Sequence, residues 1–181
     1  MKKLLIISVM VMLVMQSNAQ FTKATLQATG LTCAMCSNAI NKALQKVSFV
    51  ESIKSDIKNS SFAIVFKQNA DVNIDALKDA VEDAGFSVGS LKVTGNFNDV
   101  KVAADQHVKI GNSDFHFLDV ASQTLNGENT ITVVDKDFVP AKQFKKISSS
   151  TKMACVQTGK AAGCCTKDGV SADARVYHVT I

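Results

Sequence analysis

Two cysteines three positions apart, Cys33 and Cys36, are the side chains with the clearest chemical potential in this sequence. Thiolate sulfur is a soft ligand that selects Cu(I) and also binds Zn(II) and other soft ions, and two thiolates alone suit an ion of low coordination number. The two-residue spacer lets both sulfurs face one ion, and the N-terminus of a following helix would favour the anionic thiolate of Cys36. The pair therefore predicts a soft-metal site.

Three other interpretations of the cysteine pair stay open at this point. A Cys-x-x-Cys sequence also fits a thioredoxin-like redox pair, which would make the chain a thiol-disulfide oxidoreductase. That interpretation has weaker support, because the single proline, Pro140, lies far from the pair and the chain has no tryptophan. A structural zinc site needs four ligands, and residues 20–93 contain no histidine and no further cysteine. A plain disulfide would suit an oxidising compartment.

The segments around the pair predict the scaffold that holds it. Residues 21–29 alternate between apolar and polar side chains, which is typical of a half-buried strand, and Gly30 interrupts the pattern. Apolar residues, among them Ile40 and Leu44, then recur at helical spacing. The other predicted elements are a hairpin of residues 50–57 and 62–66, a helix over 74–84 capped by Asp71 or Asn73 and stopped by Gly85, and a strand over 87–93. This β-α-β-β-α-β order is that of an α+β, ferredoxin-like sandwich.

A family resemblance begins at the metal loop. Gly30-Leu31-Thr32-Cys33-Ala34-Met35-Cys36 resembles the Gly-Met-Thr-Cys-x-x-Cys signature of heavy-metal-associated domains, the modules of copper chaperones, metal-pumping P-type ATPases and mercuric-ion-binding periplasmic proteins. Asp83-Ala84-Gly85-Phe86 is similar to the closing segment of these domains. Leu31 replaces the usual Met, a swap between apolar side chains of similar volume, and Ser48-Phe49 stands where Gly-Val is common. The resemblance covers residues 20–93.

The resemblance implies a function and a set of site residues. Cys33 and Cys36 would be the metal ligands, and Gly30, Thr32 and Phe86 would support the metal loop. The ion would be Cu(I), with Hg(II), Zn(II) or Cd(II) as alternatives, because two thiolates serve them all. A copper chaperone-like protein would pass its ion to another thiol-bearing protein, such as a P-type ATPase or an efflux component. A periplasmic mercury scavenger would differ from it in the ion.

The N-terminus has the layout of a secretory signal peptide. Lys2 and Lys3 precede an apolar run over residues 4–15, and the small residue Ala19 stands before the predicted cut, so residues 1–19 are expected to be removed. The apolar run is shorter than the roughly 20 residues that a membrane span requires. We therefore expect an exported, periplasmic protein with no stable membrane insertion after cleavage.

Composition argues against several classes of partner and activity. The chain has 20 basic and 16 acidic residues, and removal of the two N-terminal lysines leaves it nearly neutral. It has no block of like charge, so neither nucleic acid nor an anionic membrane is indicated as a partner. It also has no nucleophile with histidine and acid at a readable spacing and no phosphate-binding glycine loop, so we predict no catalytic residues.

The remainder of the chain predicts a β-rich domain over residues 100–181. The turn-forming residues 94–99 are the predicted linker before it. One helix is predicted over 141–147, with Pro140 in its first turn. Strands are predicted at residues 100–104, 107–110, 115–121, 130–134, 153–158 and 175–181. This order resembles a small OB-type barrel in outline.

A second group of sulfur-bearing residues lies in this half. Met153, Cys155, Cys164 and Cys165 fall within 13 residues around a glycine-rich connection. They predict either a second soft-metal site or a disulfide from Cys155 to one of the other two cysteines, and the residues do not decide between them. The chain has five cysteines, an odd number, so at least one thiol stays outside any internal disulfide.

The three histidines, His107, His116 and His178, stand apart from one another in strand-like segments. A lone histidine in such a segment is more often a surface or core residue than a metal ligand. Imidazole also prefers borderline ions, whereas the rest of the chain offers sulfur. We therefore predict no role in metal binding for the histidines.

Overall fold

The computed structural model of the 181-residue chain describes residues 19–31, 33–163 and 165–181. The strands in these residues form one eight-stranded sheet in the order β2-β3-β1-β4-β7-β8-β6-β5. The elements of the first half are β1 (Gln20–Thr29), α2 (Ala34–Gln45), β2 (Val50–Asp56), β3 (Ser61–Phe66), α3 (Ile74–Asp83) and β4 (Ser87–Val102). Those of the second half are β5 (Gln106–Ile110), β6 (Ser113–Phe117), β7 (Gln123–Val133), α4 (Ala141–Ser148), α5 (Cys155–Thr158), a 3-10 turn (Thr166–Asp168) and β8 (Val176–Thr180).

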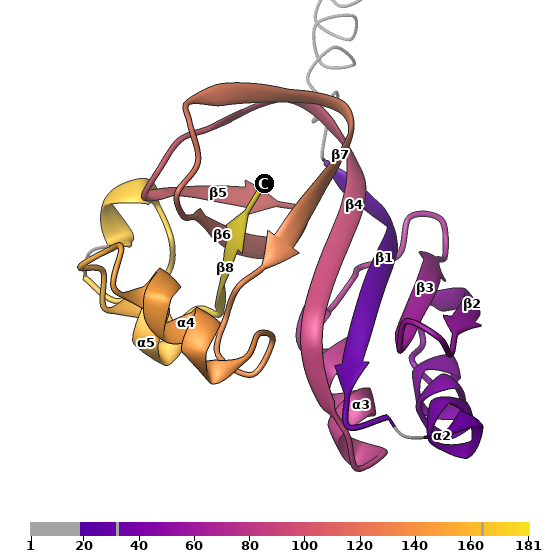
Figure 1. The fold of residues 1–181 in the computed structure, drawn as a ribbon. Coiled ribbons are helices and arrows are strands. Elements are labelled where there is room, and N and C mark those ends of the chain that lie inside the picture. Colours follow the sequence, from indigo (N-terminus) through magenta and orange to yellow (C-terminus); the bar gives the residue numbers. More distant parts are fainter. Residues whose placement is uncertain (1–18, 32, 164) are drawn as a thin grey trace, which may run out of the picture.

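The first half has the predicted ferredoxin-like order, with α2 and α3 on one face of the β2-β3-β1-β4 strands (Figure 1). Strand β1 buries alternate side chains, and α2 buries Ile40 and Leu44, as the apolar spacing predicts. Asn73 is the N-cap of α3, because its side-chain oxygen accepts a hydrogen bond from the Ala76 amide. Gly85 follows the helix with a φ of 85° in the left-handed region, which is favourable for glycine.

Strand β4 is longer than predicted and joins the two halves of the chain. It pairs antiparallel with β1 on one side and with β7 on the other. The predicted linker, residues 94–99, lies inside β4, and its turn-forming residues produce a register shift between Phe97 and Val100. The linker prediction was wrong because β7 supplies hydrogen-bond partners to backbone groups that a turn would have left to solvent.

The second half is β-rich, as predicted, but its sheet is open. Strand β8 lies between β7 and β6, antiparallel to the first and parallel to the second. The outermost strands are β2 at one edge and β5 at the other, so the sheet does not close and no OB-type barrel is present among the described strands. The second half therefore extends the sheet of the first half.

Residues 155–158 are helical, although the sequence predicts a strand over 153–158. The helix α5 begins at Cys155 and ends before Gly159, which has a left-handed φ of 68° and donates its N–H to the Cys155 carbonyl. The one helix predicted in this half, over residues 141–147, is present as α4, directly after Pro140. No helix in the described part of the chain combines the length and the apolar character needed to cross a membrane.

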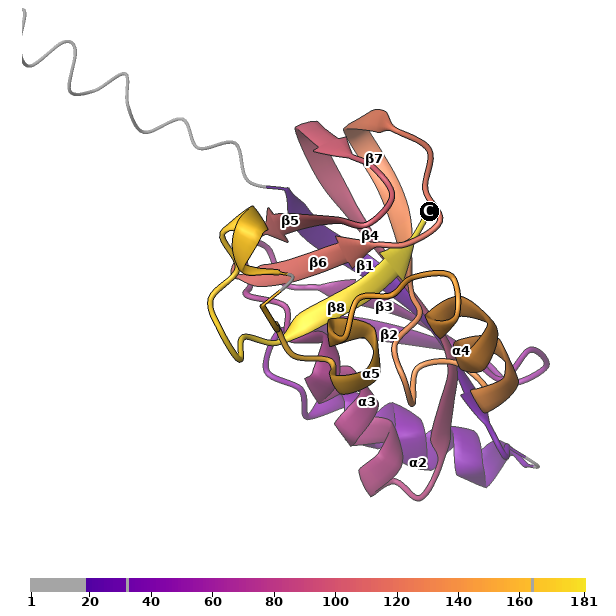
Figure 2. The ribbon, with the colours of Figure 1, turned by 90° about the vertical axis from the view of Figure 1, so that its left-hand side faces the viewer.

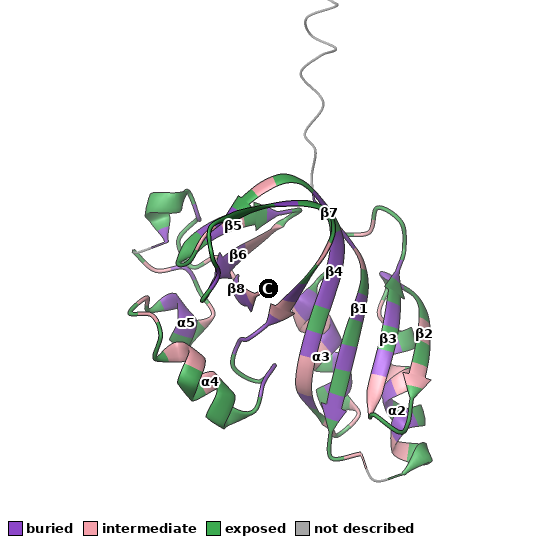
Figure 3. Cartoon of the chain, turned by 45° about the horizontal axis from the view of Figure 1, so that its top comes forward, coloured by how far each residue is buried: buried purple, intermediate pink, exposed green. Residues whose placement is uncertain are grey.

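The buried apolar side chains of the described residues form two clusters. The larger cluster runs from the first half into the second: the Phe21 ring of β1 meets the Phe115 ring of β6 edge to face at 5.5 Å, and the Tyr177 ring of β8 lies 5.5 Å beyond Phe115. The smaller cluster contains Cys155 and Cys165 and covers the opposite face of the second half. Strands β6 and β8 are therefore buried on both faces, whereas β1 shows purple and green in alternation in Figure 3.

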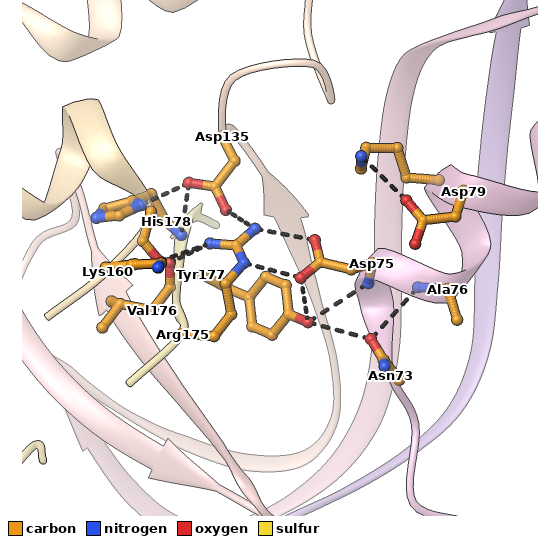
Figure 4. A network of polar contacts seen from close by, with 12 residues as sticks. Asn73, Asp75, Ala76, Asp79, Asp135, Lys160, Arg175, Val176, Tyr177 and His178 are labelled. Atoms are coloured by element: carbon orange, nitrogen blue, oxygen red, sulfur yellow. Dashed lines mark hydrogen bonds and ion pairs between the residues drawn. The ribbon is translucent and has the colours of Figure 1, made fainter. Parts of the chain in front are cut away.

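A polar network joins α3 to the second half (Figure 4). The Arg175 guanidinium donates to both carboxylate oxygens of Asp75 at 2.8 and 3.0 Å and to Asp135 at 2.8 Å. Its Cζ lies 4.2 Å from the centre of the Tyr177 ring, and the Tyr177 hydroxyl donates to Asp75 at 3.1 Å. Burial disfavours the charged guanidinium, but the two carboxylates outweigh that effect and raise the pKa of Arg175 above its ordinary value. Burial and the Asp75 charge likewise raise the pKa of Tyr177.

Gly95 marks the closest approach of β1 and β4. A Cβ atom at this position would lie 2.6 Å from the Gln20 carbonyl oxygen, a backbone atom that cannot move alone. Gly95→Ala should therefore lower the free energy of unfolding by about 1–3 kcal/mol, as overpacking does, measured by urea denaturation. Asn96→Ala is the matched control on the exposed face of β4 and should change stability by less than about 0.5 kcal/mol. Equal losses in the two variants would contradict the steric argument.

Candidate metal centre

The cysteine pair lies at the start of α2, where β1 gives way to the helix. Cys33 is the N-cap residue and is exposed, and Cys36 lies in the first helical turn with an intermediate exposure. Their Sγ atoms are 3.0 Å apart, longer than a disulfide bond of about 2.05 Å. Met35, between them, is 82% exposed, which agrees with its expected role as a spacer.

Two of the predicted support residues lie close to each other beside the loop before the helix. Gly30 has a φ of 81° in the left-handed region, where a side chain would add strain, and a Cβ there would lie 4.0 Å from the Phe86 ring. Phe86 is half-buried and packs against the larger apolar cluster. Ser37 follows the pair as a buried residue whose amide donates to the Cys33 carbonyl. Thr32, the third predicted support residue, lies outside the described residues.

The predicted second sulfur site is placed differently from the expectation. Cys155 and Cys165 are both fully buried, and Met153 packs against the same small cluster. Cys164 lies outside the described residues. Cys155 stands on α5, within the segment predicted as a strand, and Cys165 precedes a 3-10 turn.

The histidines do not stand apart in the folded chain. His107 pairs with His116 across β5 and β6, and His116 pairs with His178 across β6 and β8. All three are buried, and the Cys155 sulfur lies beside the first two rings. The expectation that the histidines are isolated was wrong. The sequence did show that each histidine lies within a strand-like segment. It could not show that the three strands are neighbours, because the histidines are up to 71 positions apart and no local spacing relates them.

The comparisons with known proteins bear on the first half of the chain. The sequence profile of the family described as heavy-metal-associated domain matches residues 25–87. The copper chaperone CopZ of Staphylococcus haemolyticus is 32% identical over 59 residues, which are 33% of this chain and 85% of the chaperone. The chain belongs to the heavy-metal-associated domain family. Its metal-binding domain carries the Cys33–Cys36 pair, and the profile match ends at the start of β4.

Other relatives share this region of the chain. The probable copper-transporting ATPase HMA5 of Arabidopsis thaliana is 27% identical over 75 residues, 41% of this chain but 7% of the ATPase, so the chain spans a small fraction of that relative. Among solved structures, a copper binding domain from HMA7, a P-type ATPase, is 35% identical over 36% of this chain and 86% of that one, with a TM-score of 0.33. Oxidized MerP from Ralstonia metallidurans CH34 is 28% identical over 38% and 97%, with a TM-score of 0.35.

The arrangement of the heavy-metal-associated domain suits capture and release of a soft ion. The two sulfurs, on the N-cap and in the first turn of α2, would approach an ion from one side, which would leave its other side open to a ligand from another molecule. The N-terminus of α2, which is the positive end of the helix dipole, lies at the pair. No acidic residue lies in the first turn of α2, so no fixed carboxylate opposes that charge.

Proposed function

We propose that this chain is an exported copper chaperone-like protein that binds Cu(I) through Cys33 and Cys36 and exchanges it with another thiol-bearing protein. The observation that carries the proposal is the pair of sulfurs 3.0 Å apart, one exposed and one partly exposed, at the N-terminus of α2 in a heavy-metal-associated domain. Soft thiolates favour Cu(I) over harder ions, and two of them leave the ion under-coordinated. An under-coordinated, exposed ion is open to attack by a partner thiolate, so ligand exchange can proceed without unfolding.

The proposed partner is a copper transporter. The relatives that support this choice are described as copper chaperones and a copper-transporting ATPase. Met35 is exposed next to the two sulfurs and would lie at the contact with such a partner. Hg(II), Zn(II) and Cd(II) are competing ions at the same dithiol, and competition experiments rank them.

The test of the proposal is an anaerobic Cu(I) titration of the reduced full chain against a chromophoric Cu(I) chelator. We expect the Cys33→Ser/Cys36→Ser variant to lose one equivalent of tightly bound Cu(I), with a fall in affinity beyond the roughly 100-fold that loss of an outer hydrogen-bonding group costs a metal site. Met35→Leu is the matched control, because it keeps both thiols and changes the exposed spacer. Its Cu(I) affinity should equal that of the parent chain.

Equal Cu(I) retention by the parent chain and the double serine variant would overturn the proposal. A thiol-disulfide oxidoreductase is the competing function of the same pair, and it has a different signature. It would reduce insulin with turnover, and Cys36→Ser would trap mixed disulfides through Cys33. We expect neither from this chain.

Export is the second part of the proposal. Its support is the predicted signal peptide together with the start of β1 at Gln20, the residue that the predicted cut would make N-terminal. Expression of the full chain in a Gram-negative host should yield a periplasmic protein, and N-terminal sequencing should begin at Gln20. Recovery of the uncut chain in the cytoplasmic fraction would contradict export.

A further inference from the structure

Three histidines form a row across the second half of the sheet. His107, His116 and His178 are directly opposite one another on β5, β6 and β8, strands that lie side by side in Figure 2, and residues in register share one face of a sheet. The His107 and His116 rings are stacked with centroids 4.4 Å apart, and the His116 and His178 centroids are 5.1 Å apart. All three side chains are fully enclosed. Burying polar imidazole nitrogens costs free energy unless they form hydrogen bonds or bind a metal ion.

The sulfur of Cys155, on α5, lies beside this row of histidines. Its Sγ lies 3.9 Å from His107 Nε2 and 3.6 Å from His116 Nδ1, and the three atoms all lie within 4.8 Å of one another. A Zn(II) ion with bonds of about 2.0–2.1 Å to nitrogen and 2.3 Å to sulfur in tetrahedral geometry places its nitrogen and sulfur ligands roughly 3.6 Å apart. The two sulfur–nitrogen separations are therefore already close to those that one such ion requires, and the two nitrogens lie within 4.8 Å of each other.

The outer nitrogens of the two rings face carboxylates. His107 Nδ1 lies 2.8 Å from Asp168 Oδ2, and His116 Nε2 lies 3.3 Å from Asp105 Oδ1. The first contact is a hydrogen bond, and it lowers the pKa of Asp168, whereas the second is close enough for an ion pair but has no hydrogen-bond geometry. In metal sites such a carboxylate fixes the tautomer of the histidine and turns the other ring nitrogen to the ion. In this structure the ring nitrogens that face away from the carboxylates, toward Cys155, are His107 Nε2 and His116 Nδ1.

The His116 ring is buried beside the other two rings of the row. Desolvation, followed by the neighbouring His178 and His107, lowers the pKa of His116 to about 4. The third ring, His178, donates or accepts at Nδ1 with Asp135 at 2.5 Å, and its Nε2 has no hydrogen-bond partner within the described residues. This last nitrogen lies outside the group of three ligand atoms.

We infer that His107 Nε2, His116 Nδ1 and Cys155 Sγ form a second metal-binding site, separate from the cysteine pair of the heavy-metal-associated domain. Two imidazoles and one thiolate suit a transition-metal ion of borderline softness, with Zn(II) as the representative ion, and differ from the two thiolates that select Cu(I). Binding releases the Cys155 thiol proton to solvent. The exposed carboxylates of Asp105 and Asp168 lie on the outer side of the site.

The site takes one sulfur from the group that the sequence predicts as a second soft-metal site or a disulfide. Its sulfur comes from one of the three C-terminal cysteines, and its other ligands come from strands that precede them by about 40 residues or more. Cys165 is buried in the same apolar cluster as Cys155 but lies outside the group of three ligand atoms. It therefore offers a matched control for removal of a buried sulfur.

The test uses the reduced full chain with Cys33→Ser and Cys36→Ser, so that the first site is silent and the inference stands independently of the proposed function. We expect this chain to bind one Co(II), a visible substitute for Zn(II), with a thiolate-to-cobalt charge-transfer band and strong tetrahedral d–d bands. One equivalent of Zn(II) should remove both features. Adding Cys155→Ala should abolish the charge-transfer band and weaken binding by more than about 100-fold, whereas adding Cys165→Ala should leave both unchanged.

Two outcomes would overturn the inference. One is the absence of stoichiometric Co(II) binding by the reduced Cys33→Ser/Cys36→Ser chain, including the case in which Cys155 is held in a disulfide that mild reductant does not open. The other is an equal loss of the band in the Cys155→Ala and Cys165→Ala variants. If Cys155→Ala does not fold, Zn(II) titration of the parent double variant by NMR decides, since the ring signals of His107 and His116 should shift and unchanged ring signals would reject the site.

Discussion

Replacing Phe115 with alanine should lower the free energy of unfolding by about 3–5 kcal/mol, the range for loss of a fully buried phenylalanine. The Phe115 ring is enclosed between Phe21 of β1 and Tyr177 of β8, each with centroids 5.5 Å away. It therefore joins apolar side chains from both halves of the chain. The cavity cannot collapse easily, because its walls belong to strands that are fixed by hydrogen bonds on either side.

Urea unfolding followed by far-UV circular dichroism and by fluorescence of Tyr177, the single tyrosine, measures this loss. The two probes should report one coincident transition, because the two halves share one sheet and one large apolar cluster. Ile57→Ala is the control: Ile57 is 56% exposed, and its truncation should cost less than about 1 kcal/mol. A Phe115→Ala chain as stable as the Ile57→Ala chain, or two separate transitions, would contradict a shared core.

Replacing Arg175 with methionine should cost about 2–4 kcal/mol. Removing one partner of a buried ion pair costs about 3–5 kcal/mol, and the partial exposure of Arg175 reduces that figure here. The Arg175 side chain is 32% exposed and that of Asp75 is 30%, but Asp135 is 5% exposed and would lose its guanidinium partner in a buried position. Methionine preserves most of the apolar stem, so the loss reports the charge and its hydrogen bonds.

The matched control for Arg175→Met is Lys23→Met. Lys23 pairs with Glu128 at 2.9 Å, but both side chains are at least half exposed, so breaking this pair should cost about 0–1 kcal/mol. Thermal unfolding of the two variants beside the parent chain measures the difference. An equal effect of the two substitutions would show that the network in Figure 4 adds no more than an exposed ion pair.

The first site could be predicted from the sequence because its information is local. The two ligands of one ion lie three positions apart, and the strand before them and the helix after them are visible as changes of apolar period. The caps and the stops, such as Asn73 and Gly85, are also local and lie where the pattern predicts. Only the placement of Phe86 beside Gly30 needed the fold, since it follows from the pairing of β4 with β1.

The second half was less predictable in part because two of its strands, β6 and β8, are buried on both faces. Residues of β6 and β8 give no alternation that would tell one face from the other, and α5 is a single short turn that reads as a strand. Residues 94–99 contain turn-forming side chains, yet they form a strand because β7 pairs with them. A preference of a few tenths of a kcal/mol per residue is overridden when backbone hydrogen bonds and burial favour the sheet.

The sequence by itself determined the cysteine pair, the ferredoxin-like order around it and the membership of this half in a metal-handling family. The tertiary structure alone decided that His107, His116 and Cys155 meet. Their contact depends on the register of β5 with β6, on the parallel insertion of β8 beside β6, and on α5 packing against that face. Register between strands far apart in the chain is set by burial of whole faces, and no spacing within a single segment records it.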